Sequence, residues 1–319
     1  MYTSYFGLKE NPFNLTPDPQ YFFLSQQHSE ALNHLIYGIN EKKGFMVVTG
    51  GIGTGKTTIS RTLLSELDES VASALIFNSS LSDMELLRTI IQEFGIKTGR
   101  GDPTKKNYID ALNRFLLENF AAGRNAVLLI DEAQNLSRSV LEQIRMLSNL
   151  ETEREKLIQI ILLGQPRLQE LLGLPSLRQL NERIMVRYDL APLNHEQVSR
   201  YIEHRLEVAR GPDGKVEFSP GACRIISDYS KGIPRRVNAI CDRALLIAYT
   251  RESAVIDRKV AKEAVDDMGG AYLVGERVSD KRREERLFFL LLVTEFIFLL
   301  ALAIIMNWND IIALFRVWE

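Results

Sequence analysis

The sequence is poor in cysteine, with only Cys223 and Cys241 among its 319 residues. Both lie among apolar residues in helical patterns, which is typical of buried reduced thiols; a disulfide or redox pair is the alternative. The four histidines show no metal-ligand spacing with the cysteines, so we expect no zinc site. The fold must therefore rest on a hydrophobic core, for which an apolar content of 45% is ample.

An excess of charge of one sign is also lacking, since 39 basic residues face 41 acidic ones and the formal net charge is −2. That balance gives no general attraction to nucleic acid, although a local basic patch is compatible with it. A cleavable signal peptide is not expected, because residues 1–20 contain Lys9, Glu10 and several prolines but no apolar stretch.

Strand and helix patterns alternate over the first two thirds of the chain. Short apolar runs predict five strands, at residues 45–49, 72–77, 126–130, 157–163 and 184–190. Helical patterns are found at 26–40, 56–67, 83–94 and 108–120. This alternation is typical of an α/β fold in which helices cover both faces of a parallel sheet, here of five strands. After Pro192 the strands stop, and helical patterns at 195–209, 220–229, 234–250 and 258–267 predict a small all-helical second domain.

Residues 50–57 match the phosphate-binding loop, or P-loop, with a strand running into it and a helix running out. Glycines let backbone N–H groups curl around phosphates, and the positive end of the following helix faces the same anion. Lys56 would hold the β and γ phosphates, and the Thr57 hydroxyl would ligate Mg²⁺. The predicted nucleotide-binding residues are Gly50, Gly51, Ile52, Gly53, Thr54, Gly55, Lys56, Thr57 and Thr58.

Two carboxylates, Asp131 and Glu132, follow the apolar run at 126–130 in the arrangement called Walker B. Asp131 at the strand tip would hold Mg²⁺ together with Thr57, and Glu132 would orient or deprotonate the attacking water. Two acids at this place could instead begin a helix. Together with the P-loop they predict an ATP hydrolase that uses ATP and Mg²⁺.

Two further motifs resemble elements of AAA+ ATPases, in which one extra strand, here 72–77, separates Walker A from Walker B. The strand at 157–163 ends in Gly164-Gln165-Pro166, which puts Gln165 beside the Walker B tip in the position called sensor 1; the alternative is a turn amide. Arg235, in Gly232-Ile233-Pro234-Arg235, is similar to sensor 2 and would reach the γ-phosphate. Arg236 is its substitute, and a surface arginine is the alternative.

An arginine finger from a neighbouring subunit is expected in this class of ATPase. Arg183 stands directly before the last predicted strand, as such fingers do, and we favour it over Arg178. A solvated or salt-bridged arginine is the alternative. A finger acting between subunits would require a homo-oligomer, for which we expect a ring.

Several motifs in register resemble the general secretion pathway protein A family over about residues 1–267. They are Tyr5-Phe6-Gly7-Leu8 with Asn11-Pro12-Phe13, the P-loop, and residues 131–136, 145–152, 163–166, 201–206 and 232–236. A group of ATPases encoded near exosortase and exopolysaccharide genes is similar too. The resemblance implies a cytoplasmic ATPase, one membrane span and a periplasmic peptidoglycan-binding domain, acting with a membrane partner to seat the secretin of type II secretion. No such periplasmic domain is expected here, so the envelope role would pass through a partner.

Residues 287–306 form one long apolar run, and about twenty residues can cross the roughly 30 Å of bilayer hydrocarbon as a helix. Fifteen of them are Leu, Ile, Val or Phe, and at about 0.3–0.6 kcal/mol each they outweigh the cost of about 2.5–3.5 kcal/mol for Glu295. Glu295 is either tolerated when protonated or meets a polar group on a partner helix. A buried helix of a soluble core is the alternative for the whole run. Basic residues at 281–286 place the ATPase region in the cytoplasm by the positive-inside rule.

These features divide the chain into six predicted parts. They are an N-terminal arm (1–40), a nucleotide-binding core (41–191), a helical lid (192–268), a basic juxtamembrane linker (269–286), a transmembrane helix (287–306) and a short periplasmic tail (307–319).

The resulting prediction is an ATPase of the bacterial inner membrane that drives assembly of a cell-envelope machine together with an inner-membrane partner. An ATPase of an exosortase or exopolysaccharide locus is the alternative. A helper ATPase of transposition or replication is less favoured, because such proteins typically add a basic or winged-helix domain and lack a span. A nucleotide-sensing scaffold is a further alternative, and Glu132 argues against it.

Overall fold

The computed structural model describes residues 1–16, 18–77, 81–97, 103–153 and 155–272. The predicted membrane span at 287–306, the tail after it and most of the linker before it lie outside these residues. Among the residues described, no helix has the length and apolar character needed to cross a bilayer. Residues Met1–Val265 make up one compact unit.

One parallel sheet forms the centre of the nucleotide-binding core, and its strand order is β2-β3-β4-β1-β5. The strands are β1 (Phe45–Gly50), β2 (Val71–Ile76), β3 (Asn125–Ile130), β4 (Gln159–Gly164) and β5 (Ile184–Leu190). The predicted five-stranded parallel sheet is therefore confirmed. All residues of β1 and β4 are buried, as expected for strands covered on both faces.

The strand between the two Walker strands in space is β4. The extra strand predicted at 72–77 separates the Walker motifs along the chain, but in the sheet it is the edge strand β2, next to β3. The carboxyl end of β4, with Gln165 directly after it, therefore lies between the P-loop and Walker B.

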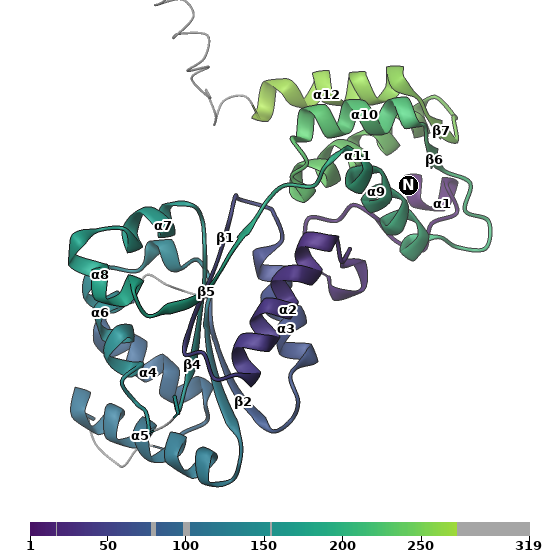
Figure 1. Ribbon diagram of the computed structural model, residues 1–319. Coiled ribbons are helices and arrows are strands. Elements are labelled where there is room, and N and C mark those ends of the chain that lie inside the picture. The colour runs from purple at the N-terminus through teal and green to yellow at the C-terminus, as the bar shows by residue number, and fades with distance from the viewer. Residues whose placement is uncertain (17, 78–80, 98–102, 154, 273–319) are drawn as a thin grey trace, which may run out of the picture. The chain divides into compact units, whose positions relative to one another are not determined.

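Helices cover both faces of the sheet (Figure 1). One face packs against α2 (Gln26–Asn40) and α3 (Lys56–Glu66), with Val48, Leu129 and Leu163 in the shared core. The other core contains Val47, Leu128 and Ile160. The helices on that side are α4 (Asp83–Glu93), α5 (Lys105–Ala121), α6 (Arg138–Leu147), α7 (Arg167–Leu172) and α8 (Arg178–Asn181). Single 3₁₀ turns are η1 (Pro19–Tyr21), η2 (Ala133–Asn135) and η3 (Pro175–Leu177).

The second domain, or lid, is not all helical, which corrects the prediction. Its helices are α9 (His195–Ala209), α10 (Pro220–Ser230), α11 (Pro234–Thr250) and α12 (Arg258–Tyr272). Two short strands, β6 (Glu217–Phe218) and β7 (Val255–Ile256), pair in parallel. Ser219, which caps α10, also donates its backbone N–H to the carbonyl of Ile256 at 3.0 Å. Strands of two residues have no periodicity that a sequence could display.

The predicted arm at 1–40 divides between the two domains. Its first part, which includes the short helix α1 (Tyr2–Tyr5), packs on the lid: the Lys9 N–H donates to the Ala209 carbonyl at 2.8 Å, and Leu8 forms an antiparallel bridge with Arg210. Phe13 is buried and meets Phe218 edge to face. Its last part is α2, which packs against β5 in the core. Residues 15–25 therefore connect the lid to the core a second time, in addition to residues 191–194.

The lid is tied to residues 191–194 through Gly232, which has a left-handed backbone at φ +71°. Its carbonyl accepts a hydrogen bond from the Leu193 N–H at 2.9 Å. A Cβ added at Gly232 would lie 1.9 Å from the Leu193 carbonyl oxygen. No side chain fits there unless this backbone moves.

We expect Gly232→Ala to destabilise the protein by clearly more than Gly123→Ala. Gly123 is the matched control, since its φ is +72° but nothing lies within 4 Å of an added Cβ. The control should lose only about 1–2 kcal/mol of stability, which is the cost of a left-handed backbone in a residue with a Cβ. Free energies of unfolding from denaturant titration provide the comparison, and equal losses in the two variants would contradict the proposed backbone clash.

Candidate nucleotide site

The P-loop is shaped by its glycines and by the start of α3. Gly53 and Gly55 have positive φ, at +78° and +106°, and Gly55 is the N-cap of α3. The buried Thr54 closes the turn, because its hydroxyl donates to the Gly51 carbonyl at 2.9 Å. The free N–H groups of the first turn of α3 thus lie at the mouth of the loop, where an anion is favoured.

Lys56 is folded back onto the loop. Its Nζ donates to the carbonyls of Gly50 at 2.8 Å and Gly51 at 2.9 Å. Burial lowers the pKa of Lys56, and the carboxylates of Glu132, Asp131 and Asp189 oppose that shift. The ammonium is therefore held by neutral carbonyls that a phosphate can replace.

The Thr57 hydroxyl donates to Oδ2 of Asp131 at 2.6 Å, so the two predicted metal ligands are in direct contact. Asp131 is buried, and its other oxygen, Oδ1, accepts from the backbone N–H of Glu132 at 2.8 Å. A hydroxyl and a carboxylate are the oxygen ligands that Mg²⁺ prefers, together with water and phosphate oxygens. The donor set at this point fits Mg²⁺.

Glu132 follows with a left-handed backbone at φ +52°, a conformation that costs free energy in a non-glycine residue and is common at functional sites. Its Oε2 accepts hydrogen bonds from two side-chain amides, those of Gln134 and of Gln165, the latter at 3.1 Å. Gln134 also accepts from the backbone N–H of Gln165 at 3.0 Å. The predicted catalytic acid and the predicted sensor 1 are thus brought together.

Gln134 was missed as a site residue, although it lies in the motif that carries the family resemblance. It is buried in η2, where a polar side chain needs partners. A glutamine two residues after the predicted catalytic acid, within a motif shared with the family, is the signal that could have indicated it.

A cavity of about 400 Å³ lies beside the P-loop, within the usual range for small-molecule sites. Its walls come from the P-loop with Glu132, from the segment that contains Asn14 and Phe23, and from the lid. Leu193 from the connecting residues 191–194 lines it too, and the lid residues are Tyr201, Arg205, Pro234, Arg235 and Asn238. Of the two sensor 2 candidates, it is Arg235 that lines this cavity, and its Cβ would be 2.8 Å from a Cβ added at Gly53.

His28, at the start of α2, packs against the P-loop and also lines the cavity. Its ring is buried, with Nε2 at 3.0 Å from the Thr54 carbonyl and Nδ1 at 2.5 Å from the Ser25 hydroxyl. This pair of contacts fits a neutral ring that donates from Nε2 and accepts at Nδ1. A Cβ at Gly55 would lie 2.6 Å from Nε2, so the imidazole packs directly on the loop.

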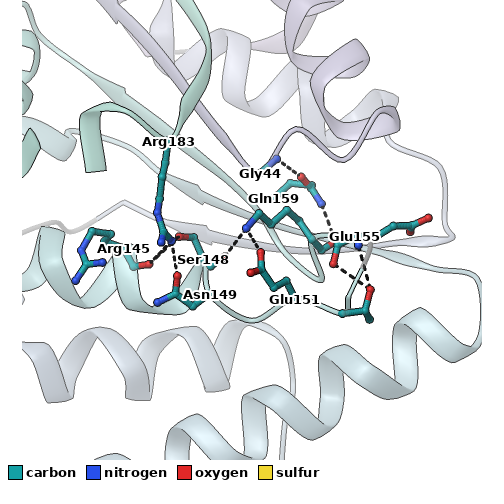
Figure 2. Close-up of polar contacts among 10 residues, drawn as sticks. Gly44, Arg145, Ser148, Asn149, Glu151, Glu155, Gln159 and Arg183 are labelled. Atoms are coloured by element: carbon teal, nitrogen blue, oxygen red, sulfur yellow. Dashed lines mark hydrogen bonds and ion pairs between the residues drawn. The ribbon is translucent and has the colours of Figure 1, made fainter. Parts of the chain in front are cut away.

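Neither predicted arginine finger lines the cavity of its own chain. Arg178 is exposed and pairs with Glu182 at 2.8 Å. Arg183 lies against the end of α6, where its Nη1 donates to the Ser148 hydroxyl at 2.7 Å, to the Asn149 side chain and to the Arg145 carbonyl (Figure 2).

Comparison with known proteins identifies the class of this site. A family profile described as an AAA domain matches residues 39–172. General secretion pathway protein A of Aeromonas hydrophila is 48% identical over 255 residues, which are 79% of this chain and 46% of that protein. The chain thus spans less than half the length of this relative. The resemblance found in the sequence motifs is confirmed for the ATPase region.

Solved structures share the fold. The Aeropyrum pernix ORC2 protein in ADPNP and ADP complexes is 17% identical, with a TM-score of 0.59 over 81% of this chain and 71% of that one. Drosophila ORC bound to DNA is 18% identical, with a TM-score of 0.61 over 81% and 64%. At this identity the likeness concerns the fold alone.

The His28 contacts predict a pH dependence that can be isolated with a glutamine. Burial lowers the pKa of His28 below its usual 6.5, so on acidification the unfolded chain binds the proton first. The stability that the neutral ring provides is present above this value and is lost as the pH falls through it. Glutamine can still donate to the Thr54 carbonyl but does not titrate in this range.

We therefore expect the wild-type free energy of unfolding to fall more than that of His28→Gln between about pH 7.5 and about pH 5.5. Denaturant titrations at both pH values give the change in free energy of unfolding for each protein. The contributions of all other titrating groups cancel when the two changes are compared. Parallel pH profiles would show that His28 is not held neutral by the fold.

Proposed function

The ATPase region of this chain belongs with the AAA ATPases related to general secretion pathway protein A, and from this premise we propose that it binds ATP with Mg²⁺ and hydrolyses it at the P-loop cavity. The observation that carries the proposal is the convergence of Lys56, Thr57, Asp131, Glu132 and Gln165 from three neighbouring strand ends. In this chain they come from the ends of β1, β3 and β4.

ATP binding would use polar groups that form hydrogen bonds within the protein when no nucleotide is bound. Lys56 would exchange the two P-loop carbonyls for phosphate oxygens, and the N–H groups of the loop would surround the β-phosphate. Thr57 and Asp131 would hold Mg²⁺, which would neutralise charge on the phosphates. Arg235 would approach the γ-phosphate from the lid, since it already lies against the P-loop.

Hydrolysis would depend on Glu132. Its carboxylate faces the cavity and would orient the attacking water and take its proton. The amides of Gln134 and Gln165 hold one oxygen, Oε2, of this carboxylate. These two hydrogen bonds hold the carboxylate in a defined orientation at the cavity.

We expect Lys56→Ala to lose ATP binding, whereas Glu132→Gln should bind ATP and retain it unhydrolysed. The first change removes the charge that the phosphates meet, and the second keeps the size of the side chain but removes the base. Lys259→Ala, an exposed lysine on α12, is the matched control and should behave as wild type. Nucleotide affinity and phosphate release measure the two steps; near-normal release by Glu132→Gln would refute the assignment of the base.

We further propose that hydrolysis serves assembly of a cell-envelope machine of the type II secretion or secretin kind, through an inner-membrane partner. The support is the 48% identity to a protein whose name places it in general secretion. An exosortase or exopolysaccharide export locus is the alternative setting for the same ATPase.

Anchoring at residues 287–306 is part of this proposal. The run contains a single charged residue, and basic side chains precede it, so one helix would cross the inner membrane with the ATPase in the cytoplasm. A reaction at the cytoplasmic face could then act on a membrane partner without a diffusing intermediate.

The full chain should accordingly remain in the membrane fraction after a carbonate wash, because a spanning helix is not released by high pH or salt. A chain that ends at Lys281 should be released, while its rate of ATP hydrolysis stays measurable in the soluble fraction. Release of the full chain by carbonate would contradict a spanning helix and leave the ATPase assignment untouched.

Finally, we propose that Arg183 of one copy completes the nucleotide site of a second copy. Arg183 does not line its own cavity, and its guanidinium bonds to the end of α6 and to Asn149 directly after it. The mixing experiment described below tests this action between copies.

A further inference from the structure

The position of Arg183 in the sheet decides which site it can serve. In the register of the parallel pair, Ile184 lies opposite Phe45 and Leu190 lies opposite Gly50. Arg183, directly before β5, is therefore at the amino edge of the sheet, whereas the P-loop begins at the carboxyl edge. Six residues at about 3.3 Å each put the two about 20 Å apart. Only the site of another copy is open to this side chain, in keeping with the proposed function on which this inference rests.

Arg183 is held by one end of its guanidinium. All its side-chain hydrogen bonds within the described residues come from Nη1, to the Ser148 hydroxyl, the Asn149 side-chain oxygen and the Arg145 carbonyl, as Figure 2 shows. Nε and Nη2 make none there. A guanidinium fixed at one nitrogen keeps its remaining N–H groups available in a defined direction.

The groups that hold Arg183 are neutral. Ser148 is the C-cap of α6, and the Arg145 carbonyl belongs to the last turn of that helix, where the negative end of the helix dipole favours a cation. Glu151 carries a charge nearby: a hydrogen bond from Lys156 and, more weakly, the charge of Arg183 lower the pKa of Glu151, whose carboxylate is bonded to Lys156 and not to Arg183. Arg183 is thus positioned without being neutralised by a bonded carboxylate, in contrast to Arg178 with Glu182.

We propose that Asn149 and Ser148 are positioning residues for Arg183: they hold its Nη1 so that the other nitrogens meet the γ-phosphate bound to a neighbouring copy. An arginine side chain that is free to rotate would lose entropy on reaching a phosphate, and the anchors remove that loss beforehand. Ser148 is buried and shapes the end of α6, whereas Asn149 is exposed. Asn149 is therefore the residue to change.

The test mixes purified full-length variants and measures phosphate release from ATP. Arg183→Ala has a complete nucleotide site but no finger, and Lys56→Ala has a finger but no nucleotide site. Their mixture should regain turnover if the finger acts between copies. Asn33→Ala, an exposed asparagine on α2, is the matched control and should keep wild-type turnover.

Asn149→Ala alone should turn over roughly tenfold more slowly than wild type, the effect of losing one hydrogen bond to a charged group, with unchanged ATP affinity. It should regain turnover when mixed with Lys56→Ala and should not when mixed with Arg183→Ala. If Asn149→Ala only impaired folding, its turnover would respond in the same way to both partners. Recovery with Lys56→Ala alone therefore shows that Asn149→Ala impairs the arginine finger and not the nucleotide site.

Three results would overturn the proposal. They are wild-type turnover of Asn149→Ala, equal behaviour with both partners, and recovery with Arg183→Ala instead of Lys56→Ala. If Arg183→Ala and Lys56→Ala fail to restore each other while both still assemble, the action of Arg183 between copies is wrong, independently of Asn149. If Arg178→Ala regains turnover when mixed with Lys56→Ala, and Arg183→Ala does not, the finger is Arg178.

Discussion

The five strands of the sheet run in one direction. All of them therefore end at one edge of the sheet and begin at the opposite edge. Hydrogen bonding between parallel strands brings the carboxyl ends of β1, β3 and β4 side by side. The P-loop, Walker B and Gln165 follow directly from these ends, so residues far apart in sequence meet at one cavity. The segment directly before β5, which contains Arg183, lies at the opposite edge. With this polarity Arg183 lies at the edge opposite its own P-loop, which is why we propose that it serves a second copy.

The N-terminal segment adds a second constraint, because it belongs to the lid at one end and to the core at the other. Arg205 on α9 fixes it to the lid: the buried guanidinium donates to the carbonyl of Pro12 and lies 4.7 Å from the centre of the Tyr21 ring. A buried charge is stable only when its donors are satisfied, and here a backbone carbonyl and aromatic rings do this. The residues between these two attachments line the nucleotide cavity, which the lid and core therefore enclose together.

Much of the core could be predicted because its signals are local. A strand, a glycine-rich loop and a lysine contiguous in sequence specify the P-loop, and the buried runs at 126–130 and 157–163 specify parallel strands. The strand order could not be predicted from the same patterns, since periodicity does not say that β4 lies between β3 and β1. The two-residue strands β6 and β7 were not predicted, because such short strands are defined by their pairing and not by a sequence periodicity.

The supporting residues of the site were harder to predict because their role depends on contacts across the chain. His28 lies 26 positions before Thr54 and acts through its carbonyl, and nothing in the sequence around either residue indicates the other. The division of residues 1–40 between lid and core has the same cause, because the contacts of Phe13 and Lys9 are with residues about 200 positions away. Sequence patterns identify groups that perform chemistry, while tertiary packing decides which groups hold them.

The two edges of the sheet are joined by α6. The segment from Asp131 to Asn149 begins with the proposed metal ligand and the proposed catalytic acid, continues through η2, and then follows α6 to the residues that hold Arg183. A helix of ten residues is about 15 Å long, most of the separation between the edges. Its apolar face, with Val140, Leu141 and Ile144, is fully buried against the sheet, and close packing leaves such a helix little freedom to shift at one end alone. The proposed base of one copy and the arginine proposed to serve the next copy are therefore joined by one closely packed helix.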